Sequence, residues 1–283
     1  MFAMRASNIR ELNFKRLLVV YAPLLTASVF FLLPVFVMLN TGLKSFAEVN
    51  FHEMWLLPRD PTLEAFTRAV QTLSINIRNS FMVSFPAALI SALIGSVNGY
   101  ILTKWRFRGS TVIYFLIIFG IFIPLQTILI PLVVVLRNIG LYSTIPGLIL
   151  AHVIYGIPIT TLMFRNYYVS IPDSLIESAS LDGFGIARIY SSICLPLSGP
   201  VFGVTFVWQF TQIWNEFLFS LVITQDPRVQ PVNVALSNLA GSYYVEWNVQ
   251  MAGALVVGLP TLLIYVFLGR FLIRGLLSGS IKS

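Results

Sequence analysis

The sequence predicts an all-α, polytopic membrane protein with six transmembrane helices and a cytoplasmic helix-turn-helix segment. Hydrophobic residues make up 57% of the 283 residues and charged residues only 10%, whereas soluble domains carry roughly 25% charged residues. The charged residues divide the chain into six long uncharged runs. Only helices and closed barrels satisfy their backbone groups in lipid, and these runs are continuous rather than alternating, which predicts helices.

Each uncharged run is long enough for the roughly 20 residues that a helix needs to cross the hydrocarbon core. We place the membrane region at residues 17–275, between a cytoplasmic N-terminal segment, 1–16, and a cytoplasmic tail, 276–283. The predicted spans cover residues 17–43, 79–103, 111–136, 142–164, 196–224 and 248–269. The first contains Pro23 and Pro34 and lacks an A-x-A-like cleavage site, so we expect an uncleaved anchor rather than a signal peptide.

The connections and the prolines add detail to this topology. The segment Lys44 to Ile77 forms a long outer loop that ends in a short amphipathic stretch, Leu63 to Leu73. The third span contains Pro124 and Pro131, and the fourth contains Pro158. Proline removes a backbone donor and bends a helix. Bent helices can line a path, but proline is also more frequent in membrane helices in general.

The distribution of Lys and Arg predicts the orientation, because basic residues accumulate on the cytoplasmic side. With the N-terminus inside, the inner segments contain twelve of the 18 basic residues and the outer segments six. The inner residues are Arg5, Arg10, Lys15, Arg16, Lys104, Arg106, Arg108, Arg165, Arg188, Arg270, Arg274 and Lys282. The outer residues are Lys44, Arg59, Arg68, Arg78, Arg137 and Arg228. We therefore expect a multi-pass protein of the cell membrane with both termini in the cytoplasm.

Several classes of function are disfavoured by composition. The net charge of +7 does not indicate nucleic-acid binding, because the basic residues lie at the ends of apolar runs and form no continuous face. A single cysteine, Cys194, excludes an internal disulfide. The two histidines, His52 and His152, lie far apart in sequence, and no Cys/His cluster predicts a metal site. We also find no nucleophile–base pair that would predict a membrane-embedded enzyme.

The most informative segment is polar and runs from Ile171 to Pro196, between the fourth and fifth spans. Pro172 suits the first turn of a helix, and a following acid favours the positive end of the helix dipole. Ile171, Leu175 and Ala179 are spaced at i, i+4 and i+8, which predicts one apolar face. The Asp-Gly pair that ends at Gly183 predicts a turn. A second short helix is expected from about residue 186.

The other face of this segment carries two acids, Glu177 and Asp182, and two small residues, Ser178 and Ser180. An amphipathic helix that rests on lipid usually has Lys and Arg on its polar face, whereas this segment is acidic until Arg188. Docking to a protein partner is therefore favoured over a lipid surface, which stays as the alternative.

The same segment resembles the EAA signature of permease subunits of bacterial ABC importers. The signature contains E-A-A, a downstream D-G and an L-P. This chain has Glu177-Ser178-Ala179, then Leu181-Asp182-Gly183, then Leu195-Pro196. Ser178 replaces the first alanine of the pattern, but serine is also small, so docking should survive.

The resemblance extends over nearly the whole chain and indicates the carbohydrate-uptake branch of these permeases, that of the smaller maltose permease subunit and of glucose/mannose-type permeases. The stretch from Gly95 to Gly109 is most similar to the glucose/mannose type. The tail, Arg274-Gly275 to Lys282, also fits this branch, although its sequence GLLSGSIKS is looser than the family's usual ending. The other matching pieces are Trp55 to Phe66, Pro124-x-Gln126, Ile130-Pro131-Leu132, Gly140-Leu141, Trp214-Asn215-Glu216 and Leu259-Pro260.

The resemblance implies a type I ABC importer fold and a set of partners. These are a second permease subunit, two ABC ATPase subunits that bind ATP and Mg²⁺, an extracytoplasmic substrate-binding protein and a sugar. No cofactor is implied for this chain, which has no G-x-x-x-x-G-K-[ST] phosphate loop. Within a coupling segment, 171–190, the residues implied to dock an ATPase are Glu177, Ser178, Ala179, Leu181, Asp182 and Gly183.

A second candidate site lies in the fifth span, where Glu216 interrupts an uncharged run. Ionisable groups inside a membrane are candidates for function. Trp208, Gln212, Asn215 and Phe219 share a helical face with Glu216, and amides beside aromatic rings suit a sugar path. The alternative is that Gln212, Asn215 and Glu216 bond to neighbouring helices.

Residues of the fourth span, His152 and Tyr155, could also face this path. A rival function is a secondary transporter driven by an ion gradient, which needs acids or histidines near the midplane. Glu216 is the acid available for that role.

Overall fold

The computed structural model describes residues 2–105, 107–241 and 245–278, and every regular element in these ranges is a helix. The prediction of an all-α protein is therefore confirmed. The chain divides into two compact units, residues 1–71 with 242–256 and residues 72–241 with 257–283. The predicted tail, 276–283, lies largely outside the described residues, as do Arg106 and Lys282.

The first unit contains α1 (Phe2–Gly42) and two single 3-10 turns, Phe46–Glu48 and Phe51–Glu53. It also contains the first parts of α2 (Glu64–Lys104) and α12 (Trp247–Ser278). Its small core consists of Ala65, Ala69, Val249 and Ala252. The small side chains of this core let α2 and α12 approach closely within the unit.

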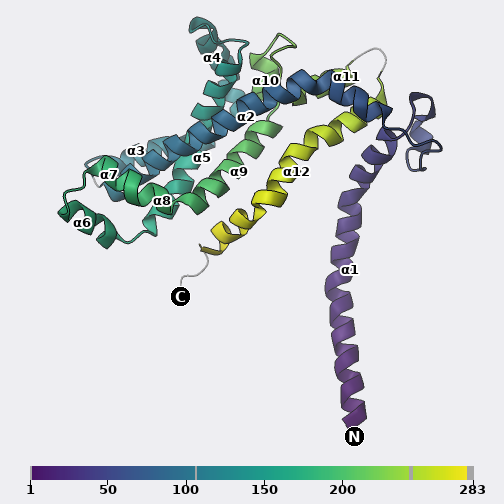
Figure 1. Ribbon diagram of the computed structural model, residues 1–283, viewed down its shortest axis with the longest axis horizontal. Coiled ribbons are helices and arrows are strands. Elements are labelled where there is room, and N and C mark those ends of the chain that lie inside the picture. The colour runs from purple at the N-terminus through teal and green to yellow at the C-terminus, as the bar shows by residue number, and fades with distance from the viewer. Residues whose placement is uncertain (1, 106, 242–244, 279–283) are drawn as a thin grey trace. The chain divides into compact units, whose positions relative to one another are not determined.

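The second unit contains the remaining parts of α2 and α12 and all other helices (Figure 1). The longer ones are α3 (Ser110–Phe119), α4 (Leu125–Asn138), α5 (Ile145–Val169) and α9 (Gly199–Asn215). The shorter ones are η3 (Gly120–Phe122), α6 (Asp173–Leu181), α7 (Ile186–Ile189), η4 (Tyr190–Cys194), α8 (Leu195–Leu197), α10 (Leu218–Ile223) and α11 (Val232–Ala240).

Four helices are long and apolar enough to cross a membrane in the described part of the chain, and two bent helix pairs raise the number to six. The four are Val19–Gly42, Glu64–Lys104, Ile145–Val169 and Trp247–Gly269. The bent pairs are Ser110–Phe122 with Leu125–Asn138, at 102°, and Ile186–Leu197 with Gly199–Asn215, at 76°. Six spans are reached if each bent pair counts as one.

The structure differs from the prediction in three spans. The amphipathic stretch from Leu63 is continuous with the second span, because α2 begins at Glu64 and extends to Lys104 without a break. The third span is broken where Ile123 adopts an extended conformation, as expected for a residue that precedes a proline. The fifth span is broken at Ser198, where the flanking helices are bent by 76°, and again after Asn215, at a position without proline or glycine.

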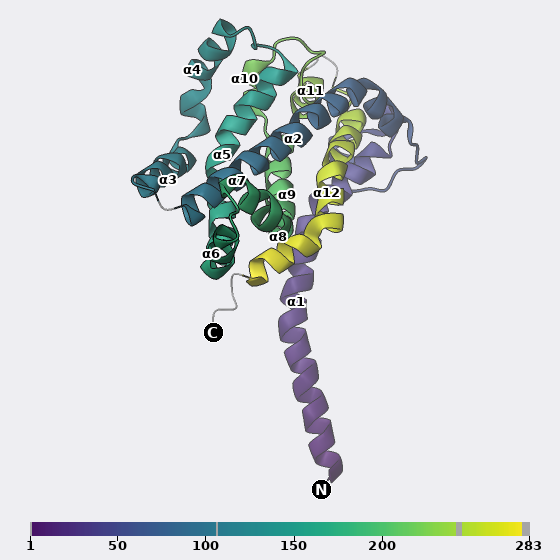
Figure 2. The ribbon, with the colours of Figure 1, turned by 60° about the vertical axis from the view of Figure 1, so that its left-hand side comes forward.

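The short helices of the second unit lie at two different ends of α5. In both ribbon views α6, α7 and α8 lie near one end of α5, whereas α10 lies near the other end beside α4 (Figures 1 and 2). Two clusters of buried residues correspond to these ends: one includes Phe210, Trp214 and Phe219, and the other includes Tyr100 and Tyr168. The two candidate sites therefore rest on separate parts of the core.

Candidate functional site

A pocket of about 340 Å³ lies between η3, α4, α5, α9 and α10. This volume is within the range of small-molecule sites. Apolar and aromatic surface dominates the wall, and a few polar groups point into it. The lining residues are Gly120, Ile121, Leu125, His152, Tyr155, Gly156, Ile159, Trp208, Gln209, Gln212, Ile213, Glu216 and Phe219.

Three of the four residues proposed for a sugar path line this pocket. Trp208, Gln212 and Glu216 are spaced four residues apart and share one side of α9 and its end. Trp208 is 44% exposed, so its ring is free to contact a ligand. Asn215 is exposed but is not among the lining residues. Phe219, which was placed on the same face, lines the wall from α10.

The fourth predicted span contributes an aromatic side to the pocket. His152 and Tyr155 both line it, and each contacts the ring of Phe219 edge-on, with centroids 5.3 Å and 5.6 Å apart. His152 is buried, whereas Tyr155 is 37% exposed. Tyr155 and Trp208 thus offer aromatic surface from two different helices.

Sequence reasoning missed Gly156 and Gln209, where α5 and α9 approach each other. A Cβ atom on Gly156 would lie 2.1 Å from Gln209 Nε2 and 2.9 Å from Ser91 Oγ. Gln209 is buried at 5% exposure and lines the pocket beside this contact. A glycine inside an apolar helix is a weak signal of such an approach, but its partner is a matter of tertiary structure.

Glu216 has a structural partner that the sequence did not indicate. It is extended, with φ −70° and ψ 132°, and it lies at the break between α9 and α10. Its carboxylate accepts hydrogen bonds from the backbone N–H of Phe219 at 2.8 and 2.9 Å and from that of Ser220 at 3.3 Å. The side chain therefore caps the first turn of α10.

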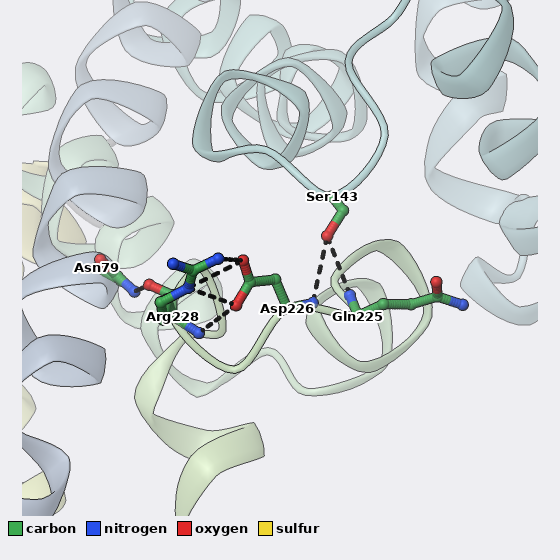
Figure 3. A network of polar contacts seen from close by, with 5 residues as sticks. All are labelled: Asn79, Ser143, Gln225, Asp226 and Arg228. Atoms are coloured by element: carbon green, nitrogen blue, oxygen red, sulfur yellow. Dashed lines mark hydrogen bonds and ion pairs between the residues drawn. The ribbon is translucent and has the colours of Figure 1, made fainter.

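The loop that follows α10 is held by polar contacts at several points (Figure 3). Ser143 Oγ accepts from the backbone N–H of Gln225 and Asp226, and Asn79 Nδ2 donates to the carbonyl of Arg228 at 2.8 Å. The Arg228 side chain and backbone N–H bond to the Asp226 carboxylate. These hydrogen bonds hold the pKa of Asp226 below its usual range. Ser143 lies in the turn before α5 and adopts a positive φ of 55°.

The predicted helix-turn-helix is formed by α6 and α7. Gly183 has φ +83°, and the N–H groups of Gly183 and Phe184 bond to the carbonyls of Ser180 and Ala179. This is the Schellman arrangement that ends a helix at a left-handed glycine, as the Asp-Gly pair predicted. After α7 the chain makes a π-helical turn, Tyr190–Cys194, before the fifth span.

The apolar face of α6 differs from the predicted one. Ile171, Ile176 and Ala179 are each 7% exposed, whereas Leu175 is 46% exposed. The prediction used Ile171 as the start of the helical period, but α6 begins at Asp173, so that the period does not apply to Ile171. The buried face packs into the cluster that contains Tyr100 and Tyr168.

The residues implied to dock an ATPase fall into two groups. Ala179 is buried beneath the helix, whereas Leu181 is 89% exposed at its end. The remaining members of the set are all exposed: Glu177, Ser178, Asp182 and Gly183. The exposed members of this set thus comprise one apolar side chain, two acids and two small residues.

The α6–α7 segment is fixed to α2 by polar contacts. Lys104 Nζ donates to the Ile171 carbonyl and to Asp173 Oδ1, both at 2.6 Å. Tyr100 Oη donates to the Ile186 carbonyl at 2.9 Å. Ser96 Oγ shares hydrogen bonds with the hydroxyl groups of Tyr168 and Tyr190. These contacts attach α6 and α7 to α2 and, through Tyr168, to α5.

The described residues contain no group of three or more His, Cys, Asp or Glu that could hold a metal ion. The two candidate surfaces are a pocket lined by aromatic and amide groups and an exposed helix that is hydrogen-bonded to α2.

Comparisons with known proteins give the family. Residues 87–277 match the model described as "Binding-protein-dependent transport system inner membrane component". The chain is 35% identical to the xylose/arabinose import permease XacI of Haloferax volcanii, with 96% of this chain and 95% of that protein covered. It is 34% identical to the glucose import system permease GlcU of Saccharolobus solfataricus, with 91% and 92% covered.

Among solved structures, a chain of a bacterial ABC transporter involved in the import of the acidic polysaccharide alginate has the same fold. Its TM-score is 0.73 at 20% identity, and the alignment covers 94% of this chain and 97% of that one. The chain belongs to the family of inner membrane components of binding-protein-dependent transport systems.

Proposed function

We propose that this chain is the permease subunit of an ATP-driven importer for a sugar and that it forms half of the translocation pathway. The observation that carries the sugar proposal is the pocket that contains Trp208, Tyr155 and Gln212. Hydroxyl groups of a sugar need hydrogen-bond partners, and the apolar face of a pyranose stacks on aromatic rings. The named substrates of the two relatives, xylose/arabinose and glucose, support the same class.

The substrate that we propose is a monosaccharide, with glucose and mannose as first candidates, or a small oligosaccharide. Trp208 and Gln212 are the residues that we expect to contact it, since both line the pocket. Asn215 is a weaker candidate because it is exposed outside the pocket lining.

The contact proposal is tested by sugar uptake into vesicles that contain the assembled transporter. Gln212→Ala should lower uptake about threefold to tenfold at subsaturating sugar, because one neutral hydrogen bond contributes about 0.5–1.5 kcal/mol. Asn215→Ala is the comparison, an amide removed three residues further along the chain and outside the pocket lining, and it should lower uptake less than Gln212→Ala. Equal uptake by Gln212→Ala and the unmodified protein would contradict the contact.

We further propose that α6 is the coupling helix, which docks an ABC ATPase subunit through Glu177, Ser178, Leu181, Asp182 and Gly183. Ala179 supports this surface from below because it is buried. A second permease subunit, two ATPase subunits with their ATP and Mg²⁺, and an extracytoplasmic binding protein complete the importer. In this arrangement ATP hydrolysis takes place on the ATPase, and both termini of the permease are cytoplasmic.

The coupling proposal predicts that Glu177→Lys reduces co-purification of the ATPase and substrate-stimulated ATP hydrolysis, because it reverses one of two charges on the docking surface. Asp60→Lys is the matched control, a charge reversal at an exposed position in the loop before α2. Retention of both the complex and the stimulated hydrolysis by Glu177→Lys would contradict the docking role.

An ion-gradient transporter is the alternative, and it would need Glu216 to bind and release a proton or an ion. The hydrogen bonds of the Glu216 carboxylate to the start of α10 favour a different role for this residue. Uptake that depends on ATP in vesicles without an ion gradient separates the two mechanisms.

A further inference from the structure

The break between α9 and α10 places Glu216 where it can set the position of α10. Both carboxylate oxygens face the N–H group of Phe219, at 2.8 and 2.9 Å, and Oε2 also accepts from Ser220. Glu216 is extended and directly precedes Phe217, the N-cap residue of α10, whose own side chain makes no capping hydrogen bond. The contacts with Phe219 and Ser220 orient the carboxylate towards the start of α10.

The helix that Glu216 caps forms one wall of the pocket. Its residue Phe219 is fully buried, and the ring lies edge-on against His152 and Tyr155. The far end of α10 is also held, since the Ser143 N–H donates to the Ile223 carbonyl at 3.0 Å. Loss of the cap at Glu216 would therefore release the end of α10 that carries Phe219.

We propose that Glu216 is a positioning residue, which fixes α10 and the ring of Phe219 as the wall of the pocket rather than contacting the sugar. The consequence for transport rests on the proposed function of the pocket. The geometric role does not, because it depends only on contacts within the chain.

This role makes a distinctive prediction about substitutions. Ser and Asp carry a side-chain oxygen that can accept from a backbone N–H at the start of a helix, whereas Ala carries none. Glu216→Ser removes the charge but keeps a capping oxygen, and Glu216→Asp keeps both. A cap should therefore be retained in Glu216→Ser and Glu216→Asp and lost in Glu216→Ala. If Glu216 instead bound a sugar or carried a proton through its carboxylate, serine at this position would not retain the function.

The test uses the assembled transporter with a cysteine introduced at Gln212, which lines the pocket and is exposed. The rate of its modification by N-ethylmaleimide reports access to the pocket without any sugar. The native Cys194 is buried, and the protein without the introduced cysteine supplies the background. In the Gln212→Cys protein, Glu216→Ala should raise the rate about fivefold. Glu216→Ser and Glu216→Asp should remain within twofold of the parent rate.

Sugar uptake is then measured for the three Glu216 variants with Gln212 intact. The expected result is a higher KM for sugar in Glu216→Ala than in the parent protein. Glu216→Ser and Glu216→Asp should have KM values close to that of the parent. An unchanged labelling rate in Glu216→Ala, or an equal rise in Glu216→Ala and Glu216→Ser, overturns the positioning role. If labelling follows the cap but Gln212→Ala leaves uptake unchanged, the positioning role stands and the sugar path proposed for this pocket fails.

Discussion

Lys104 and Asp173 form an ion pair of 2.6 Å that joins the C-terminal end of α2 to the start of α6. The Lys104 side chain is only 2% exposed, and its ammonium group also bonds to the Ile171 carbonyl. One buried cation thus fixes both the first turn of α6 and the chain that enters it. This attachment makes the α6–α7 segment a rigid extension of α2.

Lys104→Met should weaken the attachment of α6, because it removes both hydrogen bonds while it retains the apolar stem. The charged hydrogen bond to the carbonyl contributes about 1.5–3 kcal/mol. We expect ATP hydrolysis that is less stimulated by substrate and a lower midpoint of thermal unfolding. Both are measured on the purified complex.

The control for Lys104→Met is Asp173→Asn, which leaves the bond from Lys104 to Ile171 in place. Asp173 is 63% exposed at its side chain, and exposed ion pairs contribute little. Its effect should be the smaller of the two. An equal or larger effect of Asp173→Asn would mean that the ion pair, not the buried carbonyl contact, holds the helix.

Leu181→Asp should reduce binding of the ATPase with little effect on the folding of the permease. The side chain is 89% exposed at the end of α6, so that its replacement disturbs no packing within the chain. A buried leucine anchor is worth about 1.5–3 kcal/mol, which corresponds to a loss of affinity of roughly tenfold to a hundredfold. Titration of the permease with purified ATPase measures this loss of affinity.

The matched control is Leu57→Asp, at a position that is 72% exposed in the loop before α2. It should leave the affinity for the ATPase unchanged. If Leu181→Asp and the parent protein bound the ATPase with equal affinity, Leu181 would not be part of the docking surface.

Local sequence signals predicted those features that depend on neighbouring residues. Gly183 ends α6 in a left-handed conformation as the Asp-Gly pair indicated, and Pro124 follows the break in the third span. Both signals act through the backbone of one or two residues. The all-helical class likewise follows from the length and continuity of the uncharged runs.

Features that depend on tertiary contacts could not be predicted in the same way. The break at Glu216 has no proline or glycine, and it becomes intelligible only through the hydrogen bonds to Phe219 and Ser220. Helical spacing placed Leu175 on the buried face, whereas Ile176 occupies it, because the start of α6 was not known. The approach of Gly156 to Gln209 depends on how two helices pack.

The contact between Asp226 and Arg228 predicts a loop that loosens in acid. Hydrogen bonds from Arg228 lower the pKa of Asp226 from its ordinary value of 3.8. A lowered pKa means that the stabilisation is present above pH 3.8 and is lost as the pH falls through the lower pKa of the folded protein. A spin label at Gln225→Cys should be equally immobile at pH 7 and pH 5 and become mobile below about pH 3.8.

Asp226→Asn provides the comparison, because it lacks the titrating group. Its label should be more mobile than that of the parent at pH 7 and show no further change at low pH. Added salt should raise the mobility of the label in the parent towards that in Asp226→Asn, since exposed charges are screened. A parent loop that loosens between pH 7 and pH 5 would point to another titrating group.

Gly156→Ala should destabilise the contact between α5 and α9. The new methyl group would lie 2.1 Å from Gln209 Nε2 and 2.9 Å from Ser91 Oγ, and overpacking of this kind costs about 1–3 kcal/mol. The pocket should narrow or lose its shape because Gln209 and Gly156 both line it. The expected result is a lower thermal midpoint together with reduced sugar uptake.

Three further variants test the cause of this effect: Gly258→Ala, Gln209→Ala and the double variant Gly156→Ala/Gln209→Ala. Gly258→Ala changes another helical glycine, but no atom lies within 4 Å of its added Cβ, so that stability should be equal or slightly higher. The double variant Gly156→Ala/Gln209→Ala removes the clashing amide and should recover part of the lost stability. The difference between the stability change of the double variant and the sum of the changes of Gly156→Ala and Gln209→Ala measures the interaction between the two positions. Additive losses would show that Gly156 is needed for a reason other than the approach of Gln209.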